Sequence, residues 1–187
     1  MNLQIILGSK SPRRKELLSL LGYDFKVVVS DIDENVTYTT YKEMVLKIAL
    51  KKAEAISANY HDHLIICADT IVVCDNEVLG KPKDKEDCRR MIKMLANKAH
   101  FVDTAVVLIY KGLTYHFIEE TKVWVTKISD DEIEEYINTD EPYDKAGGYG
   151  IQGIFGKYIE KINGDYYNVM GLPICHLNKE IKRIMDI

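Results

Sequence analysis

The sequence predicts a single domain of the α/β class over residues 1–187. Short apolar runs, typical of strands, alternate along the chain with segments in which apolar residues recur every three or four positions, as on one face of a helix. With 47% hydrophobic and 29% charged residues, the composition is that of an ordinary globular protein, and the chain is long enough to bury a sizeable core. Two tightly joined lobes also fit this length, and no repeat or low-complexity linker marks a boundary.

The first half of the chain predicts strands and helices in turn. Ser11-Pro12 supplies an N-cap and a proline at the first helical position, and Gly22 is a suitable stop for the helix that follows. Asp75-Asn76 predicts a turn. The expected elements are strands over residues 3–7, 25–29 and 64–74 and helices over residues 12–21, 45–56 and 85–96.

The second half begins with two long β-rich runs around Lys111-Gly112, which predict a hairpin. Ser129 and Glu132 make a capping box for a helix that reaches about residue 138. Five of the eleven glycines fall between Gly147 and Gly156, which indicates a shaped loop. The expected elements are strands over residues 101–110, 114–126 and 157–162, a segment over residues 165–169 and a last helix after residue 173.

Charge and flanking residues exclude two classes of protein. The net charge of −4 provides no overall positive field for a nucleic-acid backbone, so we expect no nucleic acid among the partners. The apolar stretch over residues 3–7 is too short for a signal peptide or a membrane span and is followed at once by basic residues, so we expect a cytoplasmic protein with no membrane partner. The four cysteines form no C-x-x-C pair and indicate reduced thiols, of which Cys67 suits a core position.

The segment from Ser9 to Arg14 has features of a phosphate site. It joins a predicted strand to a helix N-terminus, where free backbone amides and the positive end of the helix dipole attract phosphate oxygens. Arg13 and Arg14 add planar, permanently charged donors suited to a polyphosphate. If Ser11 is the N-cap, Ser9 is the freer candidate ligand. The alternative is that this segment only starts the helix and its cations only keep the surface soluble.

Asp69 and Thr70 interrupt an otherwise apolar strand. Burying an unpaired carboxylate is costly, and a metal ion or a lysine partner is the usual remedy. The lysine of Gly80-Lys81-Pro82 is able to serve as that partner, although such a tripeptide is usually just a turn. The pattern favours a functional carboxylate at position 69 over a structural one.

A small acidic cluster follows the second predicted strand. Asp31, Asp33 and Glu34 offer carboxylate oxygens to a hard divalent cation that keeps several of its waters. Acidic loops are usually only solvated, and that alternative stays open.

The loop over residues 140–153 combines charged, aromatic, amide and glycine positions. Its glycines permit close approach of the backbone to a ligand, and the amide of Gln152 has the donor and the acceptor needed to pair with the edge of a base. The alternatives are a tightly wound structural loop with Tyr149 packed inside, and a buried Gln152 amide that only ties the loop together.

Taken in order along the chain, these residues resemble the motifs of the Maf family of proteins, and all four prolines lie inside those motifs. The motifs are Ser9-x-Ser11-Pro12-Arg13-Arg14-x-Glu16-Leu17-Leu18, Asp33-Glu34, Lys52-Ala53, Ala68-Asp69-Thr70, Gly80-Lys81-Pro82, Glu141-Pro142-x-Asp144-Lys145-Ala146-Gly147 with Ile151-Gln152-Gly153, and Gly164-Asp165-Tyr166 with Gly171-Leu172-Pro173.

The resemblance implies an elongated, two-lobed α/β fold with a mixed sheet, similar to the inosine-triphosphate pyrophosphatases, with a nucleotide cleft between the lobes. It also implies a reaction in which water attacks the α-phosphorus of a nucleoside triphosphate and pyrophosphate leaves. Arg13, Thr70 and Gln152 are similar to the residues of the branch that acts on dTTP and UTP, whereas a branch acting on N7-methyl-GTP carries others there. Family likeness further suggests a homodimer.

Residue chemistry and the resemblance together assign roles to the candidate residues. We expect Asp69 to be the general base and, with Glu34, to hold Mg²⁺ or Mn²⁺. The rival interpretation is a non-catalytic nucleotide sensor that affects cell division, which needs a phosphate cradle but neither base nor metal. The preferred nucleotide among dTTP, UTP and modified pyrimidines is left open. The other expected roles are neutralisation of the triphosphate by Ser9, Arg13, Arg14, Lys52 and Lys81 and contact with the base or sugar by Thr70 and Gln152.

One region departs from the family pattern. Ala96-Asn97-Lys98-Ala99-His100 stands where Maf proteins commonly have Ser-Gly before the central histidine, and Asp103-Thr104-Ala105 replaces a more usual x-Thr-Gly. We expect a helix end and a strand start here, with a changed loop and no loss of catalysis. The departure weakens any role for His100.

Overall fold

The structure is a computed structural model that describes residues 4–185. The chain forms two compact units. The first consists of Met1–Asp69, Thr104–Glu119 and Gly171–Ile187, and the second of Thr70–Asp103 and Glu120–Met170.

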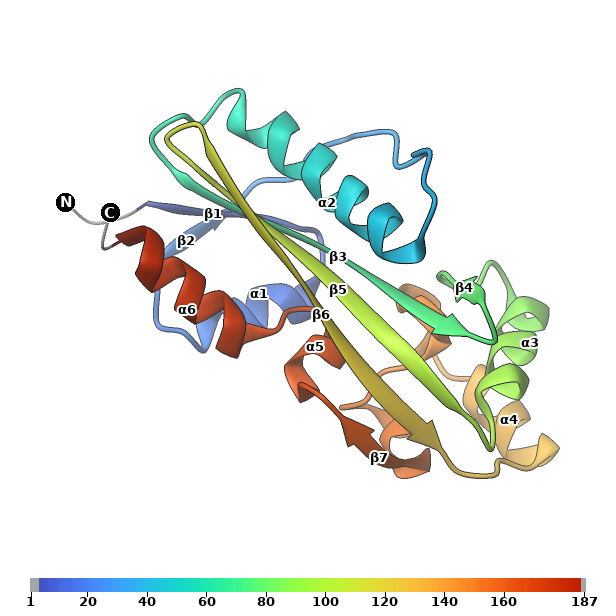
Figure 1. The fold of residues 1–187 in the computed structure, drawn as a ribbon. Coiled ribbons are helices and arrows are strands. Elements are labelled where there is room, and N and C mark those ends of the chain that lie inside the picture. Colours follow the sequence, from blue (N-terminus) through green and yellow to red (C-terminus); the bar gives the residue numbers. More distant parts are fainter. Residues whose placement is uncertain (1–3, 186–187) are drawn as a thin grey trace. The chain divides into compact units, whose positions relative to one another are not determined.

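In the first unit, one long helix lies on one side of the strands and two helices lie together on the other side (Figure 1). The long helix is α2 (Tyr41–Ser57), and the other two are α1 (Pro12–Ser19) and α6 (Ile174–Met185). The short strand β1 (Ile5–Gly8) is fully buried and pairs in parallel with β2 (Phe25–Val27). Leu3, which the sequence assigns to the first strand, lies outside the described residues.

The second unit is built around an apolar core that includes Leu79, Ile92, Ile133 and Phe155. Helix α3 packs against helix α4 and against the short turn η2. The elements of this unit are β4 (Glu77–Leu79), α3 (Lys85–Leu95), α4 (Asp130–Ile137), the 3₁₀ turns η1 (Pro142–Asp144), η2 (Ala146–Gly148) and η3 (Ile154–Tyr158), β7 (Ile159–Asn163) and α5 (Tyr166–Met170).

Three long strands run from one unit into the other: β3 (Leu64–Cys74), β5 (Ala99–Tyr110) and β6 (Leu113–Val125). Within residues 4–185 the sheet has the order β2-β1-β3-β5-β6-β7, with β4 paired to β3. β1 is parallel to β2 and β3, whereas β4 and β7 are antiparallel to their neighbours. The predicted α/β class with a mixed sheet is therefore confirmed.

The local signals place most element ends within a few residues. Ser11 caps α1 with Pro12 in its first turn, and the capping box of α4 forms as expected. The predicted turns are present, because Asp75-Asn76 and Lys111-Gly112 all have positive φ, between 48° and 76°. The first helix and the second strand each end two residues early, and α2 begins at Tyr41 because the Thr40 hydroxyl caps it.

Two further expectations concern membrane-spanning helices and the cysteine thiols. In the part of the chain that the structure describes, no helix has both the length and the apolar character needed to cross a membrane. The cysteines are free thiols, and Cys67 is buried in the core as expected. Burial raises the pKa of the Cys67 thiol to about 12, so this group is inert near neutral pH.

Candidate active site

Lys52 connects two carboxylates within the first unit. Its Nζ lies 2.7 Å from Oδ1 of Asp69 and 2.9 Å from Oε1 of Glu34. The side chains of Lys52 and Asp69 are only 17% and 16% exposed, whereas that of Glu34 is 58% exposed. A helix, a strand and a loop thus deliver one ammonium and two carboxylates to a single cluster with an excess of negative charge.

The helical pattern of α2 explains why Lys52 reaches strand β3. Ile48, Ala49 and Ala53 are buried, and Lys52 borders this apolar face. Its long side chain can therefore lie along the packed surface while its ammonium meets the carboxylate. The sequence offered Lys81 as a possible partner for Asp69, and within the first unit the lysine that contacts Asp69 is Lys52. Lys81 is exposed and belongs to the second unit.

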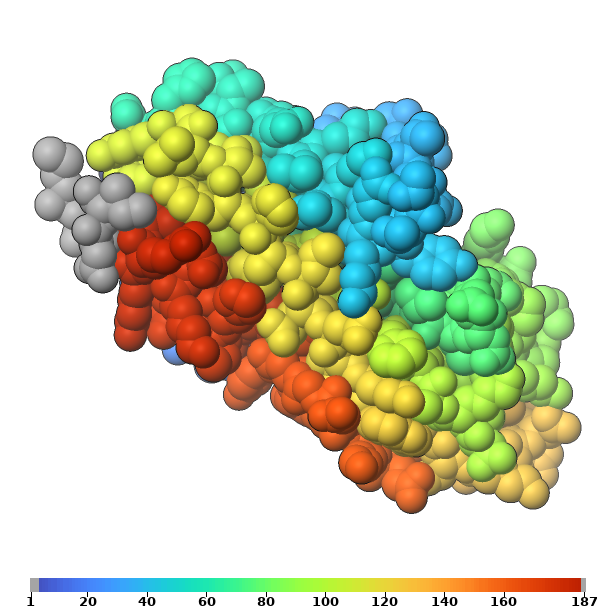
Figure 2. All heavy atoms as spheres, in the orientation of Figure 1, coloured from blue at the N-terminus to red at the C-terminus, as the bar shows by residue number. Residues whose placement is uncertain are grey.

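Glu34 is presented by the loop between β2 and α2, which lies at the surface beside the helix (Figure 2). Lys51 Nζ donates hydrogen bonds to the carbonyls of Asp33 (2.8 Å) and Asn35 (3.2 Å), the two neighbours of Glu34. The carboxylate of Asp33 accepts from the backbone and side-chain amides of Asn35. Of the predicted acidic cluster, Glu34 reaches Lys52, Asp33 shapes the loop, and Asp31 is exposed.

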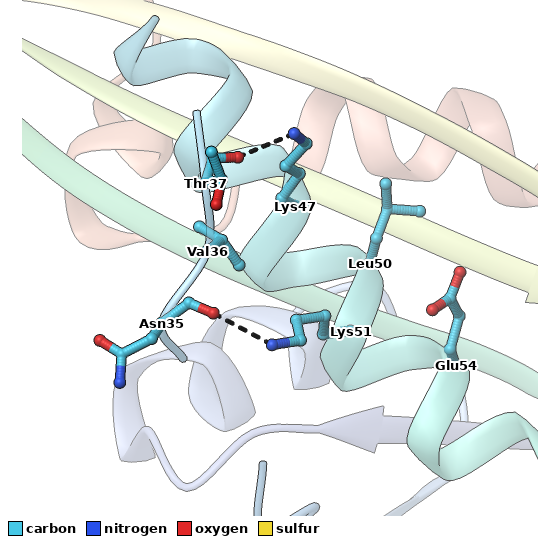
Figure 3. Close-up of a pocket in the computed structure, with 7 residues that line it drawn as sticks. All are labelled: Asn35, Val36, Thr37, Lys47, Leu50, Lys51 and Glu54. Atoms are coloured by element: carbon cyan, nitrogen blue, oxygen red, sulfur yellow. Dashed lines mark hydrogen bonds between the residues drawn. The ribbon is translucent and has the colours of Figure 1, made fainter. Parts of the chain in front are cut away.

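A cavity of about 440 Å³ lies between the same loop and α2 (Figure 3). Lys47 donates to the carbonyl of Thr37 at 2.8 Å, so two lysines one helical turn apart fasten the loop to the helix. None of the predicted site residues lines this cavity. Its lining residues are Asn35, Val36, Thr37, Lys47, Leu50, Lys51 and Glu54.

The segment between β1 and α1 is organised by its own side chains. Ser11 Oγ accepts from the backbone amide of Arg14, and Ser9 Oγ accepts from the backbone amide of Ser11 at 3.1 Å. Arg14 donates from Nη1 to Ser9 Oγ (3.5 Å) and from Nε to the carbonyl of Gly171 (2.8 Å). Ser9 is 8% exposed and is not the freer group that the sequence suggested, because it helps to fix the loop.

Positive charge gathers at the start of α1. Its first turn contains no acidic residue, so its backbone dipole adds to the charges of Arg13 and Arg14. Burial is the main cause that lowers the pKa of the Arg14 guanidinium, while Asp69 acts in the opposite direction and Arg13 adds to the lowering. Glu34 acts in the same direction as Asp69 on the pKa of Arg14.

The second unit carries the other predicted site residues. Thr70 is half-buried on β3, and Lys81 and Gln152 are exposed. The exposure of Gln152 rules out the alternative of a buried amide that only ties the loop together. It leaves the amide available to a ligand.

The first half of the glycine-rich loop is structural, in agreement with the alternative of a tightly wound loop with Tyr149 packed inside. Tyr149 is 5% exposed, and its hydroxyl lies 2.6 Å from Nε2 of His100, which is fully buried. Burial lowers the pKa of His100 to about 4. The sequence missed this pair, because its partners are 49 residues apart and the family departure at residues 96–100 argued against a role for His100.

Comparisons with known proteins agree with the motifs. A family model described as "Maf-like protein" matches residues 4–184. A protein of Bacillus anthracis named dTTP/UTP pyrophosphatase is 44% identical over 181 residues, which cover 96% of this chain and 95% of that protein. A protein of the same name from Bacillus cereus is 43% identical over 181 residues, which again cover 96% of this chain and 95% of that protein. Among solved structures, the Ham1 protein of Staphylococcus aureus matches with a TM-score of 0.47 and 14% identity over 65% of this chain and 71% of that one.

Proposed function

Because this chain belongs to the Maf family, we propose that it hydrolyses dTTP and UTP to the nucleoside monophosphate and pyrophosphate. Two relatives at 43–44% identity carry the name of that activity and align over nearly their whole length. A modified pyrimidine triphosphate falls within the same proposal, since it offers the same phosphates to the cluster.

The observation that carries the proposal is the contact of Lys52 with both Asp69 and Glu34. A protein that only senses a nucleotide needs cations for the phosphates but gains nothing from two carboxylates, which repel them. Hydrolysis needs both, because a base must take a proton from water while cations stabilise the charge that develops on the phosphates.

In the proposed mechanism, Asp69 is the general base. One of its oxygens accepts from Lys52 at 2.7 Å, which holds the carboxylate in place on strand β3. Its other oxygen takes a proton from the attacking water as the bond to the α-phosphorus forms and the bond to the leaving pyrophosphate breaks. Lys52 thereby orients the base and adds positive charge near the reacting phosphate.

The triphosphate is bound by the basic segment at the start of α1, and Lys81 of the second unit is retained as a further candidate cation. Arg13 and the amides at the helix N-terminus supply donors to phosphate oxygens. Arg14 already bonds Ser9 and Gly171, so it acts from a fixed position, which is the condition for electrostatic stabilisation of a leaving group.

The carboxylates of Asp69 and Glu34 fit a divalent metal. They provide two hard oxygen ligands that already converge on one cation, the ammonium of Lys52. Mg²⁺ is usually held by one or two carboxylates together with substrate phosphates, so these two groups are the candidate ligands. When bound, Mg²⁺ or Mn²⁺ would supply charge that polarises the phosphates.

Recognition of the base is assigned to Thr70 and Gln152. Uracil and thymine present a carbonyl, an imide N–H and a second carbonyl, and a glutamine amide donates to one while accepting from its neighbour.

We extend the proposal to a homodimer in the cytoplasm. Sedimentation of the purified protein tests the assembly, and fractionation of cells tests the compartment.

A kinetic panel tests the proposed substrate. The purified protein with Mg²⁺ is given dTTP, UTP, CTP, GTP, ATP, N7-methyl-GTP and modified pyrimidine triphosphates at equal concentrations. We expect the highest kcat/KM for dTTP and UTP. A preference for N7-methyl-GTP would assign the chain to the other branch, and binding without any product would support the sensor.

A further inference from the structure

The carboxylate of Glu141 fixes the segment that follows Gln152. Its Oε2 accepts from the backbone amide of Ile154 at 2.6 Å, and its Oε1 accepts from that of Phe155 at 3.2 Å. Oε1 also accepts from the hydroxyl of Tyr136 at 3.2 Å, and Phe155 is fully buried. The chain immediately after Gln152-Gly153 is therefore held by a charged acceptor and by the core of the second unit.

Gly150 and Gly153, on either side of Gln152, have no room for a side chain, because other side chains occupy the space where a Cβ would lie. A methyl group at position 153 would overlap the carboxylate of Glu141, and one at position 150 would lie 2.9 Å from Cε of Lys145. Neither glycine has a positive φ, so close packing and not backbone conformation requires glycine at these positions. Lys145 is in turn fastened to the Glu141 carbonyl at 2.6 Å and to Asp144 at 2.6 Å.

We propose that Glu141 is a positioning residue for pyrimidine selectivity: its carboxylate fixes the position and orientation of the exposed Gln152 amide. The inference rests on the proposed role of Gln152 in base recognition. Two neutral hydrogen bonds to a base distinguish it from another base only if the amide is held in place, because a mobile amide adapts to either. The segment formed by Glu141 and Lys145 supplies that rigidity from both sides of Gln152.

The competing interpretation is that Glu141 only caps the turn η3 and contributes to stability. The two interpretations differ in what changes when the cap is lost. A purely structural cap lowers thermal stability and lowers activity toward all triphosphates alike. A positioning residue lowers the ratio of kcat/KM for UTP to kcat/KM for GTP, through a higher KM for UTP with a smaller change in kcat.

The test is Glu141→Gln, in which one of the anionic acceptors becomes an amide N–H₂ that cannot accept. We expect the UTP-to-GTP ratio of kcat/KM to fall by about tenfold, the effect of losing one well-formed neutral pairing. The matched control is Glu132→Gln, which removes a carboxylate that accepts from the backbone of Ser129 in the same unit. We expect this control to lower the melting temperature and to leave the ratio unchanged.

A second pair of variants, Gly153→Ala and Glu141→Asp, is tested singly and combined in case Glu141→Gln does not fold. Gly153→Ala forces the Glu141 carboxylate to move, and Glu141→Asp withdraws it by one methylene. We expect Gly153→Ala to lower the ratio and the double variant to recover part of it. Losses in the ratio that add without any recovery would overturn the proposal even if Glu141→Gln does not fold.

The outcomes separate this inference from the proposed function. If the unmodified protein shows no pyrimidine preference, or if Gln152→Glu leaves that preference unchanged, the role of Gln152 fails and the inference fails with it. If Gln152→Glu narrows the preference while Glu141→Gln leaves it intact, the proposed function stands and the positioning role of Glu141 is refuted.

Discussion

The ammonium of Lys52 lies 2.7 Å from the carboxylate of Asp69, and the two side chains come from a helix and a strand 17 positions apart. Both are largely shielded from water, so their attraction is screened less than that of a surface pair. Glu34 adds a second carboxylate to the same ammonium, which leaves the cluster with a net negative charge.

Replacing Asp69 by asparagine tests the base directly. Asp69→Asn keeps the shape and one acceptor for Lys52 but removes the group that takes a proton. We expect pyrophosphate release from UTP to fall by about 10²- to 10⁴-fold, with substrate binding retained. Asp62→Asn, at an exposed position in the same unit, is the control and should be fully active. Near-normal turnover of Asp69→Asn would exclude this carboxylate as the base.

Replacing Glu34 by glutamine tests the metal. The variant keeps a side chain of the same size near Lys52 but removes one anionic ligand. We expect the affinity for Mn²⁺, measured by water proton relaxation without substrate, to fall by at least about tenfold, a loss typical even of groups that only support a metal ligand. Removal of metal with EDTA should abolish hydrolysis by the unmodified protein. Unchanged Mn²⁺ affinity in the variant would place the metal elsewhere.

The burial of His100 predicts that the stability of the protein depends on pH. Burial lowers the pKa of His100 from 6.5 to about 4, so between these values the unfolded chain binds a proton that the folded protein does not. The contribution to the free energy of unfolding is therefore present above pH 6.5 and is lost as the pH falls toward 4, by about 3 kcal/mol in all. Urea unfolding at pH 7 and pH 5 should show about 2 kcal/mol of this loss, and His100→Gln should flatten it. The exposed His61→Gln should keep the full dependence, and an equal slope in all three proteins would contradict this account.

The close approach of β1 to its neighbours predicts the cost of a single methyl group. A Cβ at Gly8 would overlap Sγ of Cys67 and lie 2.6 Å from Cδ1 of Ile56, both in the core. We expect Gly8→Ala to lower the free energy of unfolding by about 1–3 kcal/mol through overpacking. Gly80→Ala meets no atom within 4 Å and should have little effect, and equal stability of the two variants would show that β1 is less tightly packed than described.

Local signals predict the elements well because they depend on neighbouring residues. Ser11-Pro12, Asp75-Asn76 and the Ser129 capping box act within one turn of chain, and each gives the expected cap or turn. Helix ends are less well predicted, as in α1, which stops at Ser19 although Gly22 was the expected stop. Propensity alone does not fix where packing ends a helix.

The candidate site could be predicted only in part, because its contacts join residues that are far apart in the sequence. The need of Asp69 for a cation follows from its burial, but its contact with Lys52 depends on how α2 packs. The hydrogen bonds of Glu141 to Ile154 and Phe155 close a loop whose path no local pattern reveals. Glu141 lies in a family motif, but no feature of the sequence was a reason to name it among the candidate site residues.

The most direct test of the account is the product of UTP hydrolysis in ¹⁸O-labelled water with Mg²⁺, followed by ³¹P NMR and mass spectrometry. Attack of water on the α-phosphorus predicts UMP and pyrophosphate in equal amounts, with the label in UMP and none in pyrophosphate. The formation of UDP and phosphate, label in pyrophosphate, or UTP that is bound and never cleaved would contradict the account.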